Sequence, residues 1–95
     1  MKVIMKKVGE ELEPIEVSNN LSELQKLVGG YIECIELFDS VVLLCDEDGS
    51  MKKLPVNFSI RDVALVRNVI FLRLEDGEFT SIKENDLETI KDLLQ

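Results

Sequence analysis

The sequence predicts an α+β fold: one domain over residues 1–95, with a mostly antiparallel twisted sheet and two helices packed on it. Three observations predict this class. The densest apolar block, residues 29–45, reads as two strands joined at Asp39 and Ser40. Two other stretches carry apolar residues at helical spacing, and Asp76-Gly77 is a strong hairpin signal. The expected order is ββαβββ, an irregular segment, then ββα.

Two short strands open the chain, at residues 2–8 and 13–17. Pro14 lacks a backbone donor, so we expect the second strand at a sheet edge. A helix follows, because Asn20 can cap it while Glu23 reaches back. Its apolar face is Leu21, Leu24, Leu27 and Val28, and Gly29 ends it in the left-handed conformation.

The apolar block predicts a hairpin in which Phe38 lies opposite Val41 and Cys34 opposite Cys45. Alternation then gives one face Ile32, Cys34, Phe38, Val41, Leu43 and Cys45, and the other Ile35, Leu37, Val42 and Leu44. Because both faces are apolar, we expect the hairpin in the middle of the sheet, with a helix over one face. A second layer or another subunit would cover the other face, and we expect a homodimer.

The second half is read from turn and period signals. We expect a third meander strand at Met51–Leu54, an irregular segment from Val56 to Leu65 with a helical turn near Ser59, and a long strand from Val66 to Leu74. After Asp76-Gly77 the chain returns as a strand over residues 78–82 and ends in a helix over residues 84–94. The expected core is Leu24, Leu27, Val28, Ile32, Ile35, Leu37, Val42, Leu44, Ile70, Leu72, Ile90 and Leu93.

Composition argues against most chemistries. The chain has no histidine, the commonest general base, so we expect no enzyme activity, no catalytic residue and no cofactor. Two cysteines without histidine do not complete a zinc site, so no metal is expected. The chain starts without a secretory signal and has no membrane-spanning run, which favours the cytoplasm, where both cysteines stay reduced. A disulfide between them is within reach in the expected register but is not expected.

Two charged sets are candidate binding sites. Arginine forks suit phosphate and carboxylate, so an anionic small molecule such as a nucleotide could bind at Asn57, Arg61, Arg67 and Arg73, in a pocket that could lie between subunits. The other interpretation is that these arginines pair with nearby acids. The acidic set is a candidate surface for a protein partner: Glu75, Asp76, Glu78, Glu84, Asp86, Glu88 and Asp92. Such a surface can also imitate DNA, whereas direct nucleic-acid binding is disfavoured by a net charge of −8.

Four segments carry a resemblance to a known family: residues 24–33 (LQKLVGGYIE), 42–49 (VLLCDEDG), 54–57 (LPVN) and 79–82 (FTSI). The chain resembles a family of short proteins of Gram-positive bacteria and their phages that is known as a domain of unknown function. Members commonly have a glycine at the entry to the long later strand, where this chain has Asn68 or a neighbour. The resemblance implies a phage or mobile-element accessory protein in the bacterial cytoplasm. With the acidic charge, it predicts a non-catalytic protein that binds and modulates a host protein; the alternative is the anionic-ligand binder.

Overall fold

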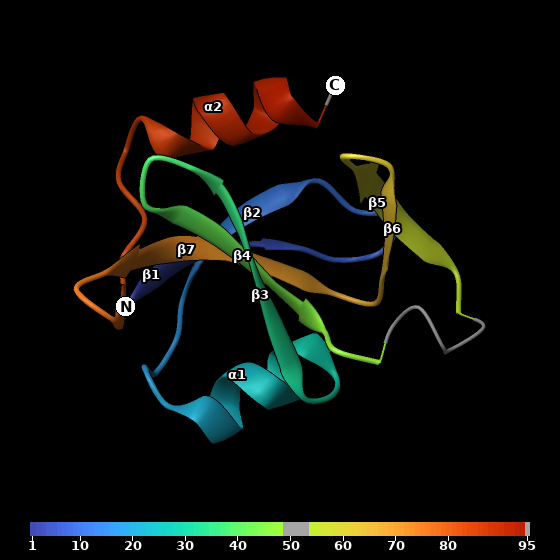
Figure 1. Cartoon of the computed structure of the whole chain (residues 1–95), viewed down its shortest axis with the longest axis horizontal. Coiled ribbons are helices and arrows are strands. Elements are labelled where there is room, and N and C mark those ends of the chain that lie inside the picture. The colour runs from blue at the N-terminus through green and yellow to red at the C-terminus, as the bar shows by residue number, and fades with distance from the viewer. Residues whose placement is uncertain (49–53, 95) are drawn as a thin grey trace.

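A computed structural model describes residues 1–48 and 54–94. Its elements in chain order are β1 (Lys2–Lys6), β2 (Leu12–Glu16), α1 (Leu21–Val28), β3 (Ile32–Phe38), β4 (Val41–Asp46), β5 (Val56–Ile60), β6 (Val63–Val66), β7 (Val69–Glu75), β8 (Glu78–Thr80) and α2 (Asp86–Leu93). The α+β class is confirmed. Helix α1 lies on one side of the sheet and α2 on the opposite side (Figure 1).

The main sheet runs in the order β2-β1-β7-β4-β3, and β8 pairs with β7. All of its pairings are antiparallel. Strand β7 is therefore the centre of the sheet, and β2 and β3 are its two ends. Pro14 lies on the edge strand β2, as its missing donor predicts.

Helix α1 begins and ends where the sequence predicts. The side chain of Asn20 accepts a hydrogen bond from the backbone N–H of Glu23 at 2.8 Å. Gly29 follows the helix in the left-handed conformation, with φ of 97°, and its N–H donates to the carbonyl of Gln25. The sequence was enough to predict both ends of this helix, because each of these hydrogen bonds joins residues within one helical turn.

The predicted register of the β3–β4 hairpin is right only at the turn. Phe38 pairs with Val41, but a bulge at Leu37 shifts the rest of β3 by one residue, so Cys34 lies opposite Leu44 and Glu33 opposite Cys45. A one-residue shift moves every side chain of a strand to the other face. The predicted faces therefore hold for β4 and are wrong for most of β3: Ile35 packs with Leu43, and Ile32 with Leu44.

The predicted central position holds for only half of this hairpin. All six residues of β4 are buried between β7 and β3, whereas β3 is the last strand of the sheet among the described residues. On β3, Glu33, Cys34 and Glu36 are exposed. The sheet thus ends in a strand that exposes two glutamates and a cysteine.

Residues 56–66 form a hairpin, so the irregular segment and the helical turn predicted there are wrong. Strands β5 and β6 pair around Arg61 and Asp62, which have φ of 50° and 65°. Positive φ at both central residues is the conformation of a type I′ turn, which usually contains Asn or Gly. Because the turn has neither Asn nor Gly, the sequence did not predict this hairpin. Phe58 of this hairpin stacks on Phe71 of β7, with ring centroids 6.1 Å apart.

The remaining elements follow the prediction with shorter bounds. Asp76 and Gly77 have φ of 53° and 78° and join β7 to β8, and α2 spans the expected region. Strand β7 starts later than expected because Arg67 adopts φ of 61°. That residue occupies the left-handed position at which a glycine would be favoured. Of the expected strand Met51–Leu54, residues 51–53 lie outside the described part, and Leu54 belongs to no strand.

Both faces of the sheet are covered within the chain. On the α1 face, Leu24 and Val28 pack on buried residues of β1, β4 and β7. On the α2 face, Ile90 of α2 and Ile60 and Leu65 of the β5–β6 hairpin pack on the opposite side chains of the same strands. The second cover that motivated a homodimer is thus supplied by residues 56–66 and α2, and the dimer itself stays a prediction.

The expected core is mostly correct. Seven of its residues are buried, namely Leu24, Val28, Val42, Leu44, Ile70, Leu72 and Ile90. Four are partly buried, namely Leu27, Ile32, Ile35 and Leu37. Leu93 was wrongly assigned to the core, since this residue of α2 is 42% exposed.

Candidate functional site

Arg73 and Asp86 were expected in two different binding sites, and the structure joins them to each other. The Nε and one terminal nitrogen of Arg73 donate to the two carboxylate oxygens of Asp86, at 2.8 and 3.0 Å. Both residues are buried, and the N–H of Lys83 also donates to Asp86. The hydrogen bonds from Arg73 hold the pKa of Asp86 below its usual value, although burial opposes them. The pair fixes the start of α2 on β7 and leaves neither group exposed to a partner.

Arg61 reaches across from the β5–β6 turn to the outer edge of β3. Its two terminal nitrogens donate to the backbone carbonyls of Glu36 and Leu37, at 2.7 and 2.6 Å. These carbonyls flank the bulge, where the strand has no neighbour among the described residues. The guanidinium therefore takes the place that a neighbouring strand's donors would occupy.

Arg67 pairs with Asp46 at the end of α1. The distance from Arg67 Nε to an Asp46 carboxylate oxygen is 3.4 Å, and the Asp46 side chain is 1% exposed. The two residues lie directly against Gly29 and Gly30. A Cβ on Gly29 would lie 2.8 Å from an Arg67 terminal nitrogen, and one on Gly30 would lie 3.0 Å from an Asp46 oxygen. The glycine pair thus ends the helix and also admits this ion pair.

Asn57 ties three segments together. Its amide nitrogen donates to the carbonyls of Lys6 and Arg67, both at 2.8 Å, and its amide oxygen accepts from the Lys6 ammonium at 3.0 Å. These bonds join β5 to the end of β1 and to the turn before β7. The side chain is committed to holding the β5–β6 hairpin on the sheet.

The four residues of the expected anion pocket are therefore spread over the molecule. Arg73 lies on the α2 face and Arg67 on the α1 face beside Gly29, so the two side chains do not meet. Arg61 lies at the β3 edge, and each guanidinium is bonded to a different part of the chain. The arrangement gives an anionic ligand no common cavity lined by these arginines.

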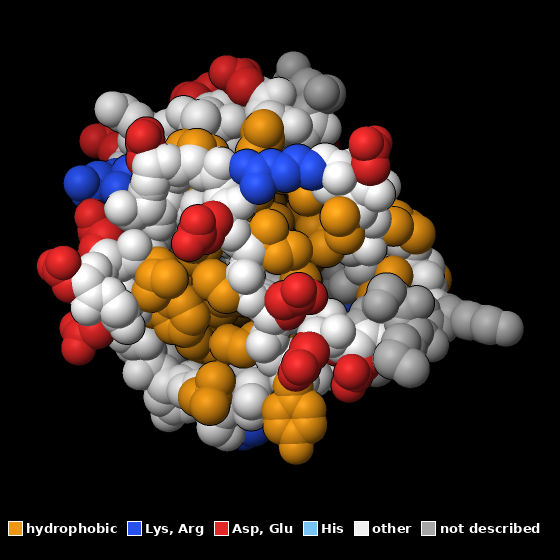
Figure 2. Space-filling model, in the orientation of Figure 1, with side chains coloured by type: hydrophobic (Ala, Val, Ile, Leu, Met, Phe, Trp, Pro, Cys, Tyr) orange, Lys and Arg blue, Asp and Glu red, His pale blue; other side chains and the backbone are white. Residues whose placement is uncertain are grey.

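Six of the seven residues of the expected acidic surface line the outside of the molecule. Asp76, Glu78, Glu84, Glu88 and Asp92 are exposed, and Glu75 is partly exposed. Asp86 is the exception, because it is buried against Arg73. In Figure 2 acidic side chains follow the left edge, where the β7–β8 hairpin lies, and the top, where α2 lies. The carboxylates come from three consecutive segments, and we call this set the acidic surface.

The sequence did not reveal two hollows that each bring a lysine of β1 near a lysine from the C-terminal part of the chain. A hollow of about 360 Å³ is lined by Lys2, Lys83 and Glu84 around Ile4 and Ile82. A second, of about 410 Å³, is lined by Lys6, Lys91 and Glu11. The four lysines come from opposite ends of the chain, so no local pattern announces them. Each hollow also contains a glutamate, which reduces its attraction for a polyanion.

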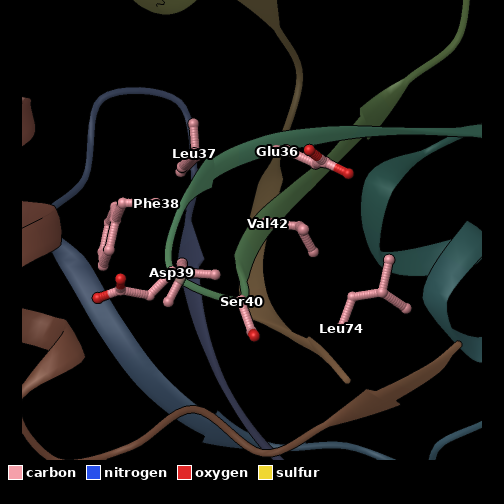
Figure 3. A pocket seen from close by; sticks show the side chains of 8 residues that line it. Glu36, Leu37, Phe38, Asp39, Ser40, Val42 and Leu74 are labelled. Atoms are coloured by element: carbon pink, nitrogen blue, oxygen red, sulfur yellow. The ribbon is translucent and has the colours of Figure 1, made fainter. Parts of the chain in front are cut away.

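Two further hollows lie beside β3. One, of about 190 Å³, is bounded by Glu33 and Ile35 of β3, Cys45 to Glu47, and Val63 to Val66 of β6. The other, of about 310 Å³, lies at the β3–β4 turn. Figure 3 shows Glu36, Val42 and Leu74 directed toward one side of this turn, with Leu37 and Phe38 on the other. Each hollow combines apolar walls with a glutamate of β3.

The cysteines lie on opposite faces of the sheet. Cys34 pairs with Leu44 on the α1 face, whereas Cys45 packs with Leu43 on the α2 face, so the predicted opposition of the two thiols is wrong. Burial, with Glu33 and Asp46 nearby, raises the pKa of Cys45 to about 11. Burial and Glu36 also raise the pKa of the exposed Cys34. Both thiols are therefore protonated at neutral pH.

The described residues also bear on metal sites and membrane spans. Across residues 1–48 and 54–94, no three His, Cys, Asp or Glu side chains are grouped closely enough to hold a metal ion. Neither of the helices found in that part of the chain is long and apolar enough to cross a membrane.

The described residues form a small α+β domain. Its main sheet has the order β2-β1-β7-β4-β3 with β8 paired to β7, and the β5–β6 hairpin packs on the α2 face of this sheet. The chain belongs to the family described as domain of unknown function (DUF3846), whose model matches residues 1–95. No curated protein and no solved structure matches it.

Proposed function

We propose that this protein is a non-catalytic accessory protein of a phage or mobile element, acting in the bacterial cytoplasm by binding and modulating a host protein through its acidic surface. The observation that carries the proposal is the exposure of Asp76, Glu78, Glu84, Glu88 and Asp92 on neighbouring segments. The phage setting rests on the resemblance of the sequence segments described above.

Charge supports a basic partner surface. The net charge is −8. Of the acidic set, Glu75 and Asp86 pair with Arg73, and Glu88 pairs with Lys91. Arg61 and Arg67 are bonded to β3 and to Asp46 instead. Complementary charge raises association rates and selects partners more than it raises affinity. The partner's contact surface is therefore expected to be rich in lysine and arginine, and its binding to weaken as salt is added.

The test is affinity capture of host proteins with two triple variants of equal charge change. One reverses Glu84, Glu88 and Asp92 on the acidic surface to lysine. The control reverses Glu10, Glu11 and Glu13, which are exposed at the β1–β2 hairpin. A specific host protein should be captured by the wild type and the control, and lost with the first variant. Equal retention or equal loss in both variants would contradict the proposal.

The anionic-ligand alternative has a separate test. A nucleotide at a hundred times its dissociation constant would stabilise the folded state by about 2.7 kcal/mol and raise the melting temperature by several degrees. We expect no such shift because the arginines lie apart. A shift that Arg67→Ala abolishes would favour the ligand binder over the protein-binding proposal.

A further inference from the structure

We propose that the outer edge of β3 binds an extended, lysine- or arginine-bearing segment of a partner protein by β-strand addition. The inference rests on the proposed function only in taking the partner to be a protein. It names a different surface, the backbone edge of residues 32–36 with the hollows on its two sides, which we call the β3 edge.

The β3 edge has peptide groups that are unpaired among the described residues. Strand β3 pairs only with β4 among the described strands. In an antiparallel ladder, successive residues direct their N–H and C=O alternately toward and away from the neighbouring strand. The carbonyl of Tyr31 accepts from Glu47 on the β4 side, and the carbonyl of Glu36 faces outward to Arg61. The peptide groups of Ile32, Cys34 and Glu36 therefore face outward.

The β3 edge already accepts hydrogen bonds from a side chain outside the strand, that of Arg61. Arg61 occupies the carbonyls of Glu36 and Leu37 with bonds of 2.7 and 2.6 Å. It marks one end of the open stretch and leaves Ile32, Cys34 and the N–H of Glu36 unpaired among the described residues. An added strand can form regular ladder bonds over this stretch and stop at the guanidinium.

Each side of the β3 edge adjoins a hollow. On the α2 side, Glu33 and Ile35 adjoin Val63, Ala64 and Leu65 around the hollow of about 190 Å³. On the α1 side, Glu36 adjoins Val42 and Leu74 (Figure 3). Figure 2, which views the molecule with β3 in front, has hydrophobic side chains on both sides of this strand and acidic ones among them. Each side thus offers apolar contact and one carboxylate.

The β3 edge suits a basic segment of a partner better than the β3 strand of a second copy of this chain. Val63 is 49% exposed, so the edge offers an incoming strand apolar surface to bury. Pairing β3 with the β3 of another copy would bring Glu33 and Glu36 of both chains into one seam, and like charges on adjacent strands are destabilising. A strand that carries lysine or arginine as well as apolar residues on each of its two faces contacts both the carboxylates and the hollows. Charge complementarity therefore selects the basic segment.

The experiment uses the full chain and a synthetic seven-residue peptide of sequence Lys-Lys-Val-Val-Lys-Lys-Val, which carries both residue types on each face of an extended strand. Amide NMR shifts should move at Ile32, Cys34 and Glu36, and fluorescence anisotropy should give saturable binding. A peptide methylated at alternate backbone nitrogens keeps its charge but loses ladder donors, and should bind at least tenfold more weakly. A glutamate–valine peptide should not bind. Cys34→Pro removes an outward N–H, which an edge strand tolerates, and should weaken binding similarly.

Three outcomes would overturn the inference. These are undiminished binding of the methylated peptide, amide shifts confined to α2 and the β7–β8 hairpin, or a β3-paired homodimer in sedimentation that excludes the peptide. The lysine variant at Glu84, Glu88 and Asp92 separates the two proposals. If it loses the host protein while the wild type binds no peptide, only this inference fails. If the peptide binds but host capture does not depend on the acidic surface, only the proposed surface fails.

Discussion

Arg73 and Asp86 form a buried ion pair with two hydrogen bonds, of 2.8 and 3.0 Å, between the end of β7 and the first residue of α2. It joins two residues that the charge pattern assigned to opposite kinds of binding site. Its role is to hold α2 over the sheet, and the first predictions concern its contribution to stability.

Asp86→Asn should lower the free energy of unfolding by about 3–5 kcal/mol, because it leaves the Arg73 guanidinium buried without its carboxylate. Urea denaturation followed by circular dichroism measures this. Glu88→Gln is the control, since the Glu88–Lys91 pair is exposed and 3.7 Å long and should change stability by less than about 1 kcal/mol. Equal effects of the two substitutions would contradict the structural role of Arg73–Asp86.

The same pair predicts a dependence of stability on acid pH. The pKa of Asp86 is lowered in the folded state, so the unfolded state takes up a proton first as the pH falls. The stabilisation is complete above the ordinary aspartate value of about 3.9 and is lost as the pH falls through the lower folded value. The difference in unfolding free energy between wild type and Asp86→Asn should shrink as the pH falls below about 3.9 towards the folded-state pKa of Asp86. A constant difference would show that the carboxylate charge is not responsible.

Leu44→Ala should destabilise the protein by about 2–5 kcal/mol, because Leu44 is fully buried on the α1 face. Leu93→Ala removes the same atoms from a residue that is 42% exposed, and should cost well under half as much. Thermal and urea unfolding of both variants provide the comparison. Similar losses would mean that α2 buries Leu93 against a surface outside the described contacts.

Gly29→Ala should cost more stability than Gly9→Ala. Both glycines have positive φ, of 97° and 76°, so both substitutions carry the left-handed penalty of about 1–2 kcal/mol. Only the Cβ at Gly29 meets Arg67, at 2.8 Å, and displaces it from the buried Asp46. The excess cost should disappear in an Arg67→Ala background. Its persistence there would place the cause in the backbone alone.

Native protein should react with one equivalent of a thiol reagent, at Cys34. Cys34 is exposed, whereas Cys45 is 3% exposed with a pKa of about 11. Both thiols should react in denaturant, and mass spectrometry after digestion identifies the labelled residue. A disulfide between the two should not form under mild oxidation, because they project from opposite faces. Rapid labelling of Cys45 in the native state would contradict the assigned register.

Elements specified by neighbouring residues were predictable from the sequence. The Asn20 cap, the left-handed Gly29 and the Asp76-Gly77 turn each depend on residues only a few positions apart, and each is found as expected. The apolar period placed Leu24, Val28 and Ile90 in the core for the same reason. The sequence also predicted that the acidic residues of the β7–β8 hairpin and α2 lie on the surface, but it did not predict that Asp86 is buried.

The tertiary structure decided which residues face each other across the sheet. Alternation along β3 is the same in either register, so only the bulge at Leu37 settles which side chains meet α1 and which meet α2. The Arg61-Asp62 turn has neither Asn nor Gly. Its hairpin is held instead by the packing of Phe58 on Phe71 and by the hydrogen bonds of Asn57. The bonds of Arg61 to Glu36, of Arg67 to Asp46 and of Arg73 to Asp86 each join residues far apart in the sequence. A sequence states which charges exist, but the free energy of an ion pair depends on distance and burial, which only the folded chain sets.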